Sequence, residues 1–204
     1  MNSIVIGEKL INPSKVVCIG RNYVDHIKEL NNETPDNMVF FIKPNSSISQ
    51  QLKFPENFSS CHYEAEISFL IEENSISAVG FGLDLTLREV QSKLKEKGLP
   101  WERAKAFDGS AVFSNFVPFN DDLEKLSVEL YINDELKQKG GVDLMINEPH
   151  DIIDEARTFM SFEDGDILMT GTPSGVGKFF KDDVFVGKIL FEDKVLVESR
   201  FKVL

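Results

Sequence analysis

Apolar residues in this chain come in short runs, most of them the length of one β-strand and separated by turn-forming residues. The clearest run covers residues 62–71, where Ile67, Phe69 and Ile71 alternate with other side chains. Predicted strands outnumber predicted helices, and the helices are scattered. This pattern favours a mixed, strand-dominated fold.

The remaining segments agree with this interpretation. Further strands are predicted at 3–11 and 15–19, separated by Asn12-Pro13, and at 39–43, 78–85, 126–132, 135–138 and 166–170, with two or three more in 184–204. Helices are predicted at 23–30, 86–97 and 148–160, and a loop at 31–37. Without an internal repeat or a flexible linker, residues 1–204 are expected to form a single strand-dominated α+β domain.

The chain is acidic, with a formal net charge of −12. Phosphate binding needs a basic surface, so nucleic acid is not an expected partner. No apolar run approaches the ~20 residues that cross a bilayer, and the first ten residues do not resemble a signal peptide. These features predict a cytoplasmic protein without membrane contact. Cys18 and Cys61 are interpreted as reduced, buried thiols, with a reactive or metal-touching thiol as the alternative.

Three acids provide the first chemical signal. In a strand, Glu64 and Glu66 would point to the same side, where two carboxylates need a proton or a cation between them. Asp84 interrupts an apolar stretch, where a solvated acid is unexpected. Together they form an all-oxygen ligand set suited to Mg²⁺ or Mn²⁺. Zinc fits less well, because no Cys or His pair has ligand spacing. An incidental pair of exposed glutamates is the alternative.

His26 and Glu29 form the second signal. Three residues apart on a helix, they share a face, and the carboxylate would fix the tautomer of the imidazole. The pair could activate a water or move a proton at neutral pH. The alternative is an exposed pair on a surface helix.

The glycine-rich segment 170–178 is not a phosphate loop, because five residues separate Gly171 from Gly177 and Phe179 follows Lys178. We interpret it as a turn after a strand that offers backbone N–H groups and Thr172 to a small anion, or as a purely structural turn. Gly80-Phe81-Gly82 lacks the third glycine of a dinucleotide fingerprint, and no Gly-x-Ser-x-Gly elbow occurs.

Taken together, these pieces resemble the fumarylacetoacetate hydrolase family, and most closely its acylpyruvase and oxaloacetate decarboxylase branch. The blocks that carry the resemblance occur in family order: Gly20-Arg21-Asn22-Tyr23 with Asp25-His26 and Glu29; Lys43-Pro44; His62-Tyr63-Glu64-Ala65-Glu66; Leu83 to Arg88 and Gln91; Gly98-Leu99-Pro100-Trp101 with Ala104-Lys105 and Phe107-Asp108; and Gly165-Asp166 with Thr170 to Pro173 and Gly175-Val176-Gly177.

The resemblance implies a C-terminal-domain-like mixed β-sandwich or roll with short helices, and a homodimer. It makes Glu64, Glu66 and Asp84 ligands of Mg²⁺, with Mn²⁺ as an alternative. His26 and Glu29 become a catalytic dyad on a mobile lid helix, and Lys105 holds the substrate or a developing enolate. The substrate site would be lined by Arg21, Lys43, Gln91 and Thr172. Two positions depart from the family pattern: Val142-Asp143 replace a Ser or Thr before Met145, and Glu89 replaces an Asp.

The function implied is metal-dependent cleavage of a small 2-oxo acid. Either the dyad activates water to hydrolyse an acylpyruvate, or oxaloacetate loses CO₂, and both release pyruvate as its enolate. The alternatives are a keto–enol tautomerase or isomerase of the same family, acting on oxaloacetate or a hydroxyheptadienedioate, and a catalytically silent relative that only binds metal.

Overall fold

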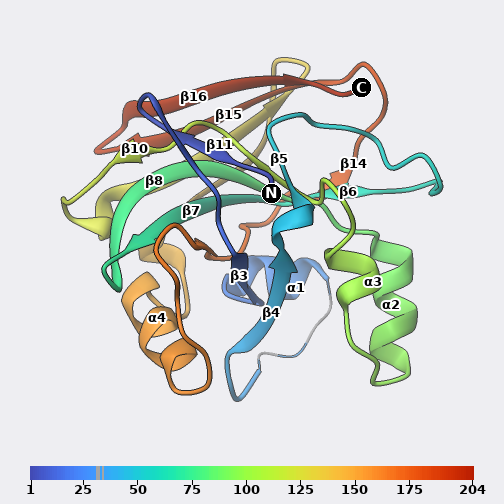
Figure 1. Cartoon of the computed structure of the whole chain (residues 1–204). Coiled ribbons are helices and arrows are strands. Elements are labelled where there is room, and N and C mark those ends of the chain that lie inside the picture. The colour runs from blue at the N-terminus through green and yellow to red at the C-terminus, as the bar shows by residue number, and fades with distance from the viewer. Residues whose placement is uncertain (31–32, 34) are drawn as a thin grey trace.

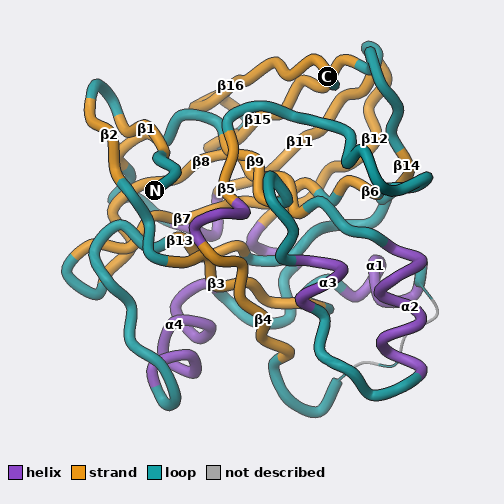
Figure 2. Tube along the Cα trace, turned by 45° about the vertical axis from the view of Figure 1, so that its right-hand side comes forward, coloured by secondary structure: helices purple, strands orange, loops and turns teal. Residues whose placement is uncertain are grey.

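A computed structural model describes residues 1–30, 33 and 35–204. The two larger β-sheets lie one above the other, and the helices gather below the larger of them (Figure 1). The tube view, turned by 45°, shows the same division between strands above and helices below (Figure 2). The chain therefore has the strand-dominated α+β fold that its short apolar runs predict.

The larger sheet has eight strands. Along its main path these are β4 (Val39–Pro44), β3 (Lys15–Gly20), β13 (Ile167–Met169), β7 (Ala65–Glu72), β8 (Ser75–Asp84), β9 (Ala111–Phe113) and β5 (Ile48–Ser49), while β10 (Val117–Pro118) pairs with β8. In its middle, β13 runs parallel to β3 and antiparallel to β7. Segments about 150 residues apart in sequence, Val16 and Ile167 for example, are therefore hydrogen-bonded neighbours.

The smaller sheet has four antiparallel strands in the order β12 (Glu135–Gly141), β11 (Leu126–Ile132), β15 (Val184–Phe191) and β16 (Lys194–Lys202). The predicted hairpin turn between β11 and β12 is confirmed. Asn133 and Asp134 both have positive φ, 52° and 67°, as a type I′ turn requires.

The main core fills the space between the two sheets. Phe81 of β8 stacks on Phe201 of β16, with ring centroids 6.2 Å apart. A Cβ at Gly187 of β15 would lie 2.4 Å from the Phe81 ring, so only glycine lets the ring approach this strand. Each fully buried aromatic or aliphatic side chain of this kind contributes about 1.5–3 kcal/mol. This packing makes a rigid platform for the polar residues at the strand ends.

Four α-helices occur among the described residues: α1 (Val24–Glu29), α2 (Arg88–Glu96), α3 (Glu102–Lys105) and α4 (Pro149–Arg157). The shorter elements are β1 (Ile4–Ile6), β2 (Lys9–Ile11), β6 (His62–Tyr63), β14 (Gly177–Lys178) and the 3-10 turns η1 (Asn45–Ser47), η2 (Leu123–Lys125) and η3 (Val142–Leu144). The predicted helices at 23–30, 86–97 and 148–160 are confirmed as α1, α2 and α4, each shorter than expected. The predicted loop at 31–37 includes residues 31, 32 and 34, which lie outside the described residues.

The predicted strand at 62–71 is interrupted at one point. Glu64 lies alone between β6 and β7. Beside it, the Ala65 N–H donates to Oε1 of Gln138, a side chain from β12, at 2.9 Å. The assumption of one continuous strand is therefore wrong, because a side chain from the other sheet satisfies a backbone donor in place of a strand neighbour. None of the helices described is long and apolar enough to cross a membrane.

Candidate active site

A small cavity of about 30 Å³ lies where the ends of the central strands meet α1, α2 and α3. Its lining residues are Ile19, Gly20, Arg21, His26, Leu30, Phe41, Glu64, Glu66, Asp84, Arg88, Gln91, Lys95, Trp101, Lys105, Gly171 and Thr172. Of the ten site residues predicted from the sequence, eight belong to this lining. A ninth, Glu29, pairs with the lining residue His26. The tenth, Lys43, lies behind it.

The three predicted metal ligands meet on one side of the cavity. Glu64 lies between β6 and β7, Glu66 belongs to β7, and Asp84 ends the adjacent strand β8. One carboxylate oxygen from each lies within 4.8 Å of the others, and all three residues are buried. The backbone hydrogen bond from Asp84 N–H to Glu64 C=O, 2.8 Å long, fixes the register that brings them together.

Lys105 offsets part of the negative charge. Its Nζ lies 2.8 Å from Glu64 Oε2, 2.5 Å from Asp84 Oδ2 and 2.7 Å from Thr86 Oγ1. Burial alone would lower the pKa of Lys105, but Asp84 and Glu64 outweigh burial and raise that pKa. The ammonium therefore stays charged between the two carboxylates.

Glu64 and Glu66 differ in their surroundings. Burial would raise the pKa of Glu64, but Lys105 and the Arg88 guanidinium, which is paired with Glu64 Oε1, hold that pKa well below its usual range. The pKa of Glu66 is raised well above its usual range by burial and by the charges of Asp84 and Glu64. One hydrogen bond acts in the opposite direction: the Gly171 N–H donates to Glu66 Oε2 at 2.8 Å and lowers this pKa. Glu66 is thus the carboxylate with the least compensated charge.

The donor set fits a hard divalent cation. Metal–oxygen bonds of about 2.1 Å place ligand oxygens about 3–4 Å apart in an octahedron, within reach of the three carboxylates after small shifts. Asp84 Oδ1 is buried and, among the described residues, receives no hydrogen bond. Lys43 Nζ lies 2.9 Å from this oxygen as an ion pair, but its N–H groups point to Lys105 O, Ser110 O and Ser110 Oγ. Asp84 Oδ1 therefore keeps its lone pairs for a cation.

The predicted dyad faces the same cavity from α1. His26 Nδ1 lies 3.1 Å from Glu29 Oε2, and the second Glu29 oxygen accepts the Gly175 N–H at 3.0 Å. A proton on Nδ1 donates to the carboxylate and leaves Nε2 as the basic nitrogen. The glycine-rich turn therefore orients Glu29, which in turn orients the imidazole.

The four residues predicted to line a substrate site have different positions. Arg21 lines the cavity with φ of 60°, a strained conformation for a residue other than glycine. Gln91 lines it and accepts from Arg88 Nη1 at 2.8 Å. Thr172 lines it too, but its hydroxyl donates to the Ala65 carbonyl and accepts from Gln138. Lys43 is fully buried beneath Asp84 and does not line the cavity.

Among the lining residues that the sequence did not identify as site residues, three have polar groups on their side chains: Arg88, Lys95 and Trp101. The helical spacing contains a usable signal. Arg88, Gln91 and Lys95 are separated by three and four residues, so they share one face of α2. The family resemblance already implied a role for Gln91, and Arg88 and Lys95 share its face.

The two departures from the family pattern lie outside the cavity lining. Asp143 is exposed and belongs to the 3-10 turn η3. Glu89 is exposed on α2, with Oε1 3.9 Å from Lys178 Nζ. Neither substitution changes a side chain that faces the acids.

The predicted burial of the two cysteines is confirmed. Both are reduced and buried, and burial raises the pKa of Cys18 well above its usual value and that of Cys61 to about 12. Thiols with such pKa values are protonated near neutral pH and react slowly.

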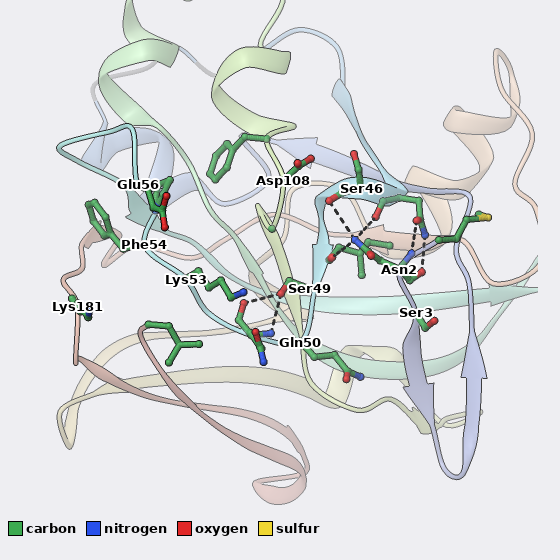
Figure 3. Close-up of a pocket in the computed structure, with 18 of the residues that line it drawn as sticks. Asn2, Ser3, Ser46, Ser49, Gln50, Lys53, Phe54, Glu56, Asp108 and Lys181 are labelled. Atoms are coloured by element: carbon green, nitrogen blue, oxygen red, sulfur yellow. Dashed lines mark hydrogen bonds between the residues drawn. The ribbon is translucent and has the colours of Figure 1, made fainter.

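A second hollow is much larger, about 1440 Å³, and open to solvent. It is lined by the N-terminus and the segment around residues 45–56, with Lys181 and Asp108 at other edges (Figure 3). Its polar groups bond to each other: the Asn2 side chain donates to the Ile48 carbonyl, and Ser49 Oγ donates to the Gln51 carbonyl. The buried acids and the dyad are elsewhere, so the small cavity is the better candidate for chemistry.

Comparison with known proteins identifies the family of this chain. The family model for the fumarylacetoacetate (FAA) hydrolase C-terminal domain matches residues 15–198. The chain is 41% identical over 187 residues to the oxaloacetate tautomerase YcgM of Escherichia coli, covering 83% of this chain and 85% of the relative. It is 36% identical over 180 residues to a mitochondrial oxaloacetate decarboxylase of Dictyostelium discoideum, covering 80% of this chain and 83% of the relative.

Among solved structures, the chain is similar to fumarylpyruvate hydrolase of Pseudomonas aeruginosa, whose crystal contains Mn²⁺ and pyruvate. The TM-score is 0.90 at 26% identity, covering 100% of this chain and 95% of the other. This chain therefore belongs to the fumarylacetoacetate hydrolase family. Its relatives are enzymes that act on small 2-oxo acids, and its buried acidic triad can bind a metal.

Proposed function

We propose that this protein is a metal-dependent enzyme that interconverts the keto and enol forms of oxaloacetate or a closely related 2-oxo acid. The observation that carries the proposal is the meeting of Glu64, Glu66 and Asp84 with the His26–Glu29 pair at one small cavity. The similarity to an oxaloacetate tautomerase favours this reaction over others of the family.

Glu64, Glu66 and Asp84 would hold the cation, for which Mg²⁺ and Mn²⁺ are both suitable. When bound, the cation supplies Lewis-acid chemistry that stabilises negative charge on the oxygens of a 2-oxo acid. The Lys105 ammonium, which now lies between Glu64 and Asp84, would then be free to turn towards the substrate. There it would bind a carboxylate or the oxygen on which the charge develops.

His26 would move the proton. In the keto form a proton leaves C3 and another is added to the 2-oxo oxygen, so no atom is gained or lost. An imidazole whose Nδ1 donates to Glu29 has a basic Nε2 for the first step. Arg21, Gln91 and Thr172 would position the substrate, and Lys43 would hold Asp84 from behind.

The present cavity volume of about 30 Å³ has room for about one water molecule. A four-carbon acid therefore requires side chains to move apart. α1 is the natural lid, because it is a six-residue helix that carries both His26 and Glu29. Closure of the lid after binding would exclude bulk water and bring the imidazole to the substrate.

A second candidate is cleavage, either hydrolysis of an acylpyruvate or decarboxylation of oxaloacetate. The oriented His26–Glu29 pair favours hydrolysis, because it can also take a proton from a water that attacks a distal carbonyl. Decarboxylation needs only stabilisation of the enolate. The named activities of the Pseudomonas and Dictyostelium relatives support these reactions.

Four further properties belong to the proposal. We propose that the 204 residues form one catalytic domain, that the natural cation is Mg²⁺ and that the protein is a homodimer. We also propose a cytoplasmic location, although several relatives are mitochondrial.

Proton NMR in D₂O tests the proposed reaction. Purified protein with Mg²⁺ is given oxaloacetate or acetylpyruvate, with a chelator as one control and Glu66→Gln as the other. Tautomerisation predicts faster keto–enol exchange of oxaloacetate without equivalent release of pyruvate, abolished by the chelator. Chelator-sensitive pyruvate from either substrate would move the assignment to cleavage. If neither exchange nor cleavage is accelerated, the proposed function is wrong.

A further inference from the structure

Lys95 lies on the cavity face of α2, together with Arg88 and Gln91. Arg88 and Gln91 are occupied, because Arg88 pairs with Glu64 and donates to the Gln91 side chain. Lys95 is one helical turn further from Glu64 along the same face. It therefore stands at the end of the cavity wall, beyond the groups that hold the acids.

The chain turn after α2 fixes the position of Lys95. Gly98 has φ of 61°, its N–H bonds to the Lys95 carbonyl, and the Leu99 N–H bonds back to the Leu94 carbonyl. This pattern reverses the chain at the helix end. As a result the Trp101 ring lies against Lys95, with Nζ 5.0 Å from the ring centroid. The aromatic face holds the ammonium at the cavity without neutralising it.

The ammonium of Lys95 has cations on its cavity side. Within the described part of the chain, it forms no hydrogen bond and no carboxylate lies within 4.0 Å of its Nζ. Burial, followed by the charges of Arg21, Arg88 and Lys105, lowers the pKa of Lys95 to about 8, while Glu64 acts in the opposite direction. An anion bound at this end of the cavity would relieve that repulsion.

The charge of the whole lining points the same way. Four cations of the lining, Arg21, Arg88, Lys95 and Lys105, face its three carboxylates, and Glu29 of the dyad adds a fourth negative charge. These charges balance, so a divalent cation on the acids gives an excess of two positive charges. A 2-oxo acid with one carboxylate compensates half of this excess, whereas a dicarboxylate compensates all of it.

We propose that Lys95, held against Trp101, binds the second carboxylate of a dicarboxylic 2-oxo acid and so sets the preference for such substrates over monocarboxylic ones. The proposal rests on the proposed function and extends it by naming the residue that binds the distal carboxylate of the substrate. Lys95 is a specificity residue here, since the proton transfer is carried by other groups.

Trp101 provides a direct readout, because it is the only tryptophan in the chain. The Mg²⁺-loaded protein is titrated with oxaloacetate and with 2-oxobutanoate, which have equal chain length and differ in the distal carboxylate. Fluorescence is read within seconds of mixing, and the midpoint gives the affinity. The variants are Lys95→Met, the charge-retaining Lys95→Arg and the matched control Lys93→Met, an exposed lysine on the same helix.

Lys95→Met is expected to weaken oxaloacetate binding about 10- to 100-fold, the loss typical of an unmade charged contact, and to leave 2-oxobutanoate binding unchanged. Lys95→Arg should recover most of the loss, and Lys93→Met should bind like the unaltered protein. Equal affinity of the unaltered protein for both acids, or equal weakening of both by Lys95→Met, overturns the proposal.

The two proposals fail in different ways. If oxaloacetate is preferred through Lys95 but neither tautomerised nor cleaved, the proposed function is wrong and the role of Lys95 stands. If oxaloacetate is turned over but Lys95→Met binds it normally, the role of Lys95 is wrong. Binding of neither acid overturns both.

Discussion

One buried acid, Asp166, and the buried triad of Glu64, Glu66 and Asp84 have opposite surroundings. Asp166, just before β13, accepts hydrogen bonds from Ser14 N and Oγ, Lys15 N and Glu163 N at 2.7–3.0 Å, and pairs with the Lys15 ammonium. Burial would raise its pKa, but these donors outweigh burial and lower it. The charge of this carboxylate is therefore compensated by hydrogen-bond donors and by Lys15. Its contacts with Ser14 and Lys15 connect the start of β3 to β13.

The triad of Glu64, Glu66 and Asp84 is the reverse case. Its carboxylates lie close enough to repel one another, and Glu66 and Asp84 Oδ1 have few donors. Satisfied buried acids stabilise a fold, whereas acids held together without enough donors are arranged for a ligand. The difference is the physical basis of our proposal that the triad binds a cation and that Asp166 has a structural role.

The largest effect is expected from Glu66→Ala. Removing one of three cation ligands should weaken Mg²⁺ or Mn²⁺ binding by more than about 100-fold, since changes around metal ligands alone cost about 10- to 100-fold. Activity should fall to background, while thermal stability of the metal-free protein is kept or raised because repulsion is relieved. Calorimetric titration and thermal melts measure both. Unchanged metal affinity would refute the ligand assignment.

His26→Ala should come next. The loss of a general base predicts a fall in kcat of about 100- to 10,000-fold for keto–enol exchange or hydrolysis. Metal affinity and the circular dichroism spectrum should stay as they are, because His26 is no ligand. Turnover retained in full would show that the dyad is a surface pair that merely packs against the cavity.

Asp166→Ala should destabilise the fold without touching the chemistry. Leaving several buried N–H groups and the Lys15 ammonium without their acceptor predicts a loss of about 3 kcal/mol in the free energy of unfolding. The folded fraction should bind metal with normal affinity. A large drop in metal affinity with little change in denaturant midpoint would contradict the structural role of Asp166.

The same carboxylate predicts a pH effect. Because the folded state lowers the pKa of Asp166 below its ordinary 3.8, its stabilising contribution is present above that value and disappears as the pH falls below it. Denaturant unfolding below pH 4 should therefore show a steeper loss of stability in the unaltered protein than in Asp166→Asn, where the titrating group is absent. Parallel curves for the two proteins would contradict this account.

The smallest effect is expected in the large open cleft. Lys53→Ala and Lys181→Ala remove exposed cations from the lining of this cleft. The buried acids line the other cavity. Metal affinity and kcat/KM should change less than about twofold, as is usual for surface substitutions. A clear rise in KM would show that substrate uses this cleft.

Much of this arrangement could be predicted from sequence. The Glu-x-Glu pair and the isolated Asp84 in an apolar stretch identified the triad, and helical spacing identified the His26–Glu29 pair. These signals are local, and side-chain chemistry at short spacing survives folding. The hairpin at Asn133-Asp134 was predictable for the same reason.

The rest depends on contacts between distant segments. The break at Glu64 comes from Gln138, more than 70 residues away, and Lys43 lies behind Asp84 because β4 and the residues after α3 meet in space. The strands β5, β6, β10 and β14 have two residues each, too few to show any periodicity. Their positions follow from pairing, which the sequence does not display.

The most direct test of the central claim is a crystal grown with Mn²⁺ and an anomalous difference map. The account predicts one strong peak about 2.1 Å from an oxygen of each of Glu64, Glu66 and Asp84, with the Lys105 ammonium moved away from the acids. A peak elsewhere, with Lys105 still bridging Glu64 and Asp84, would contradict it.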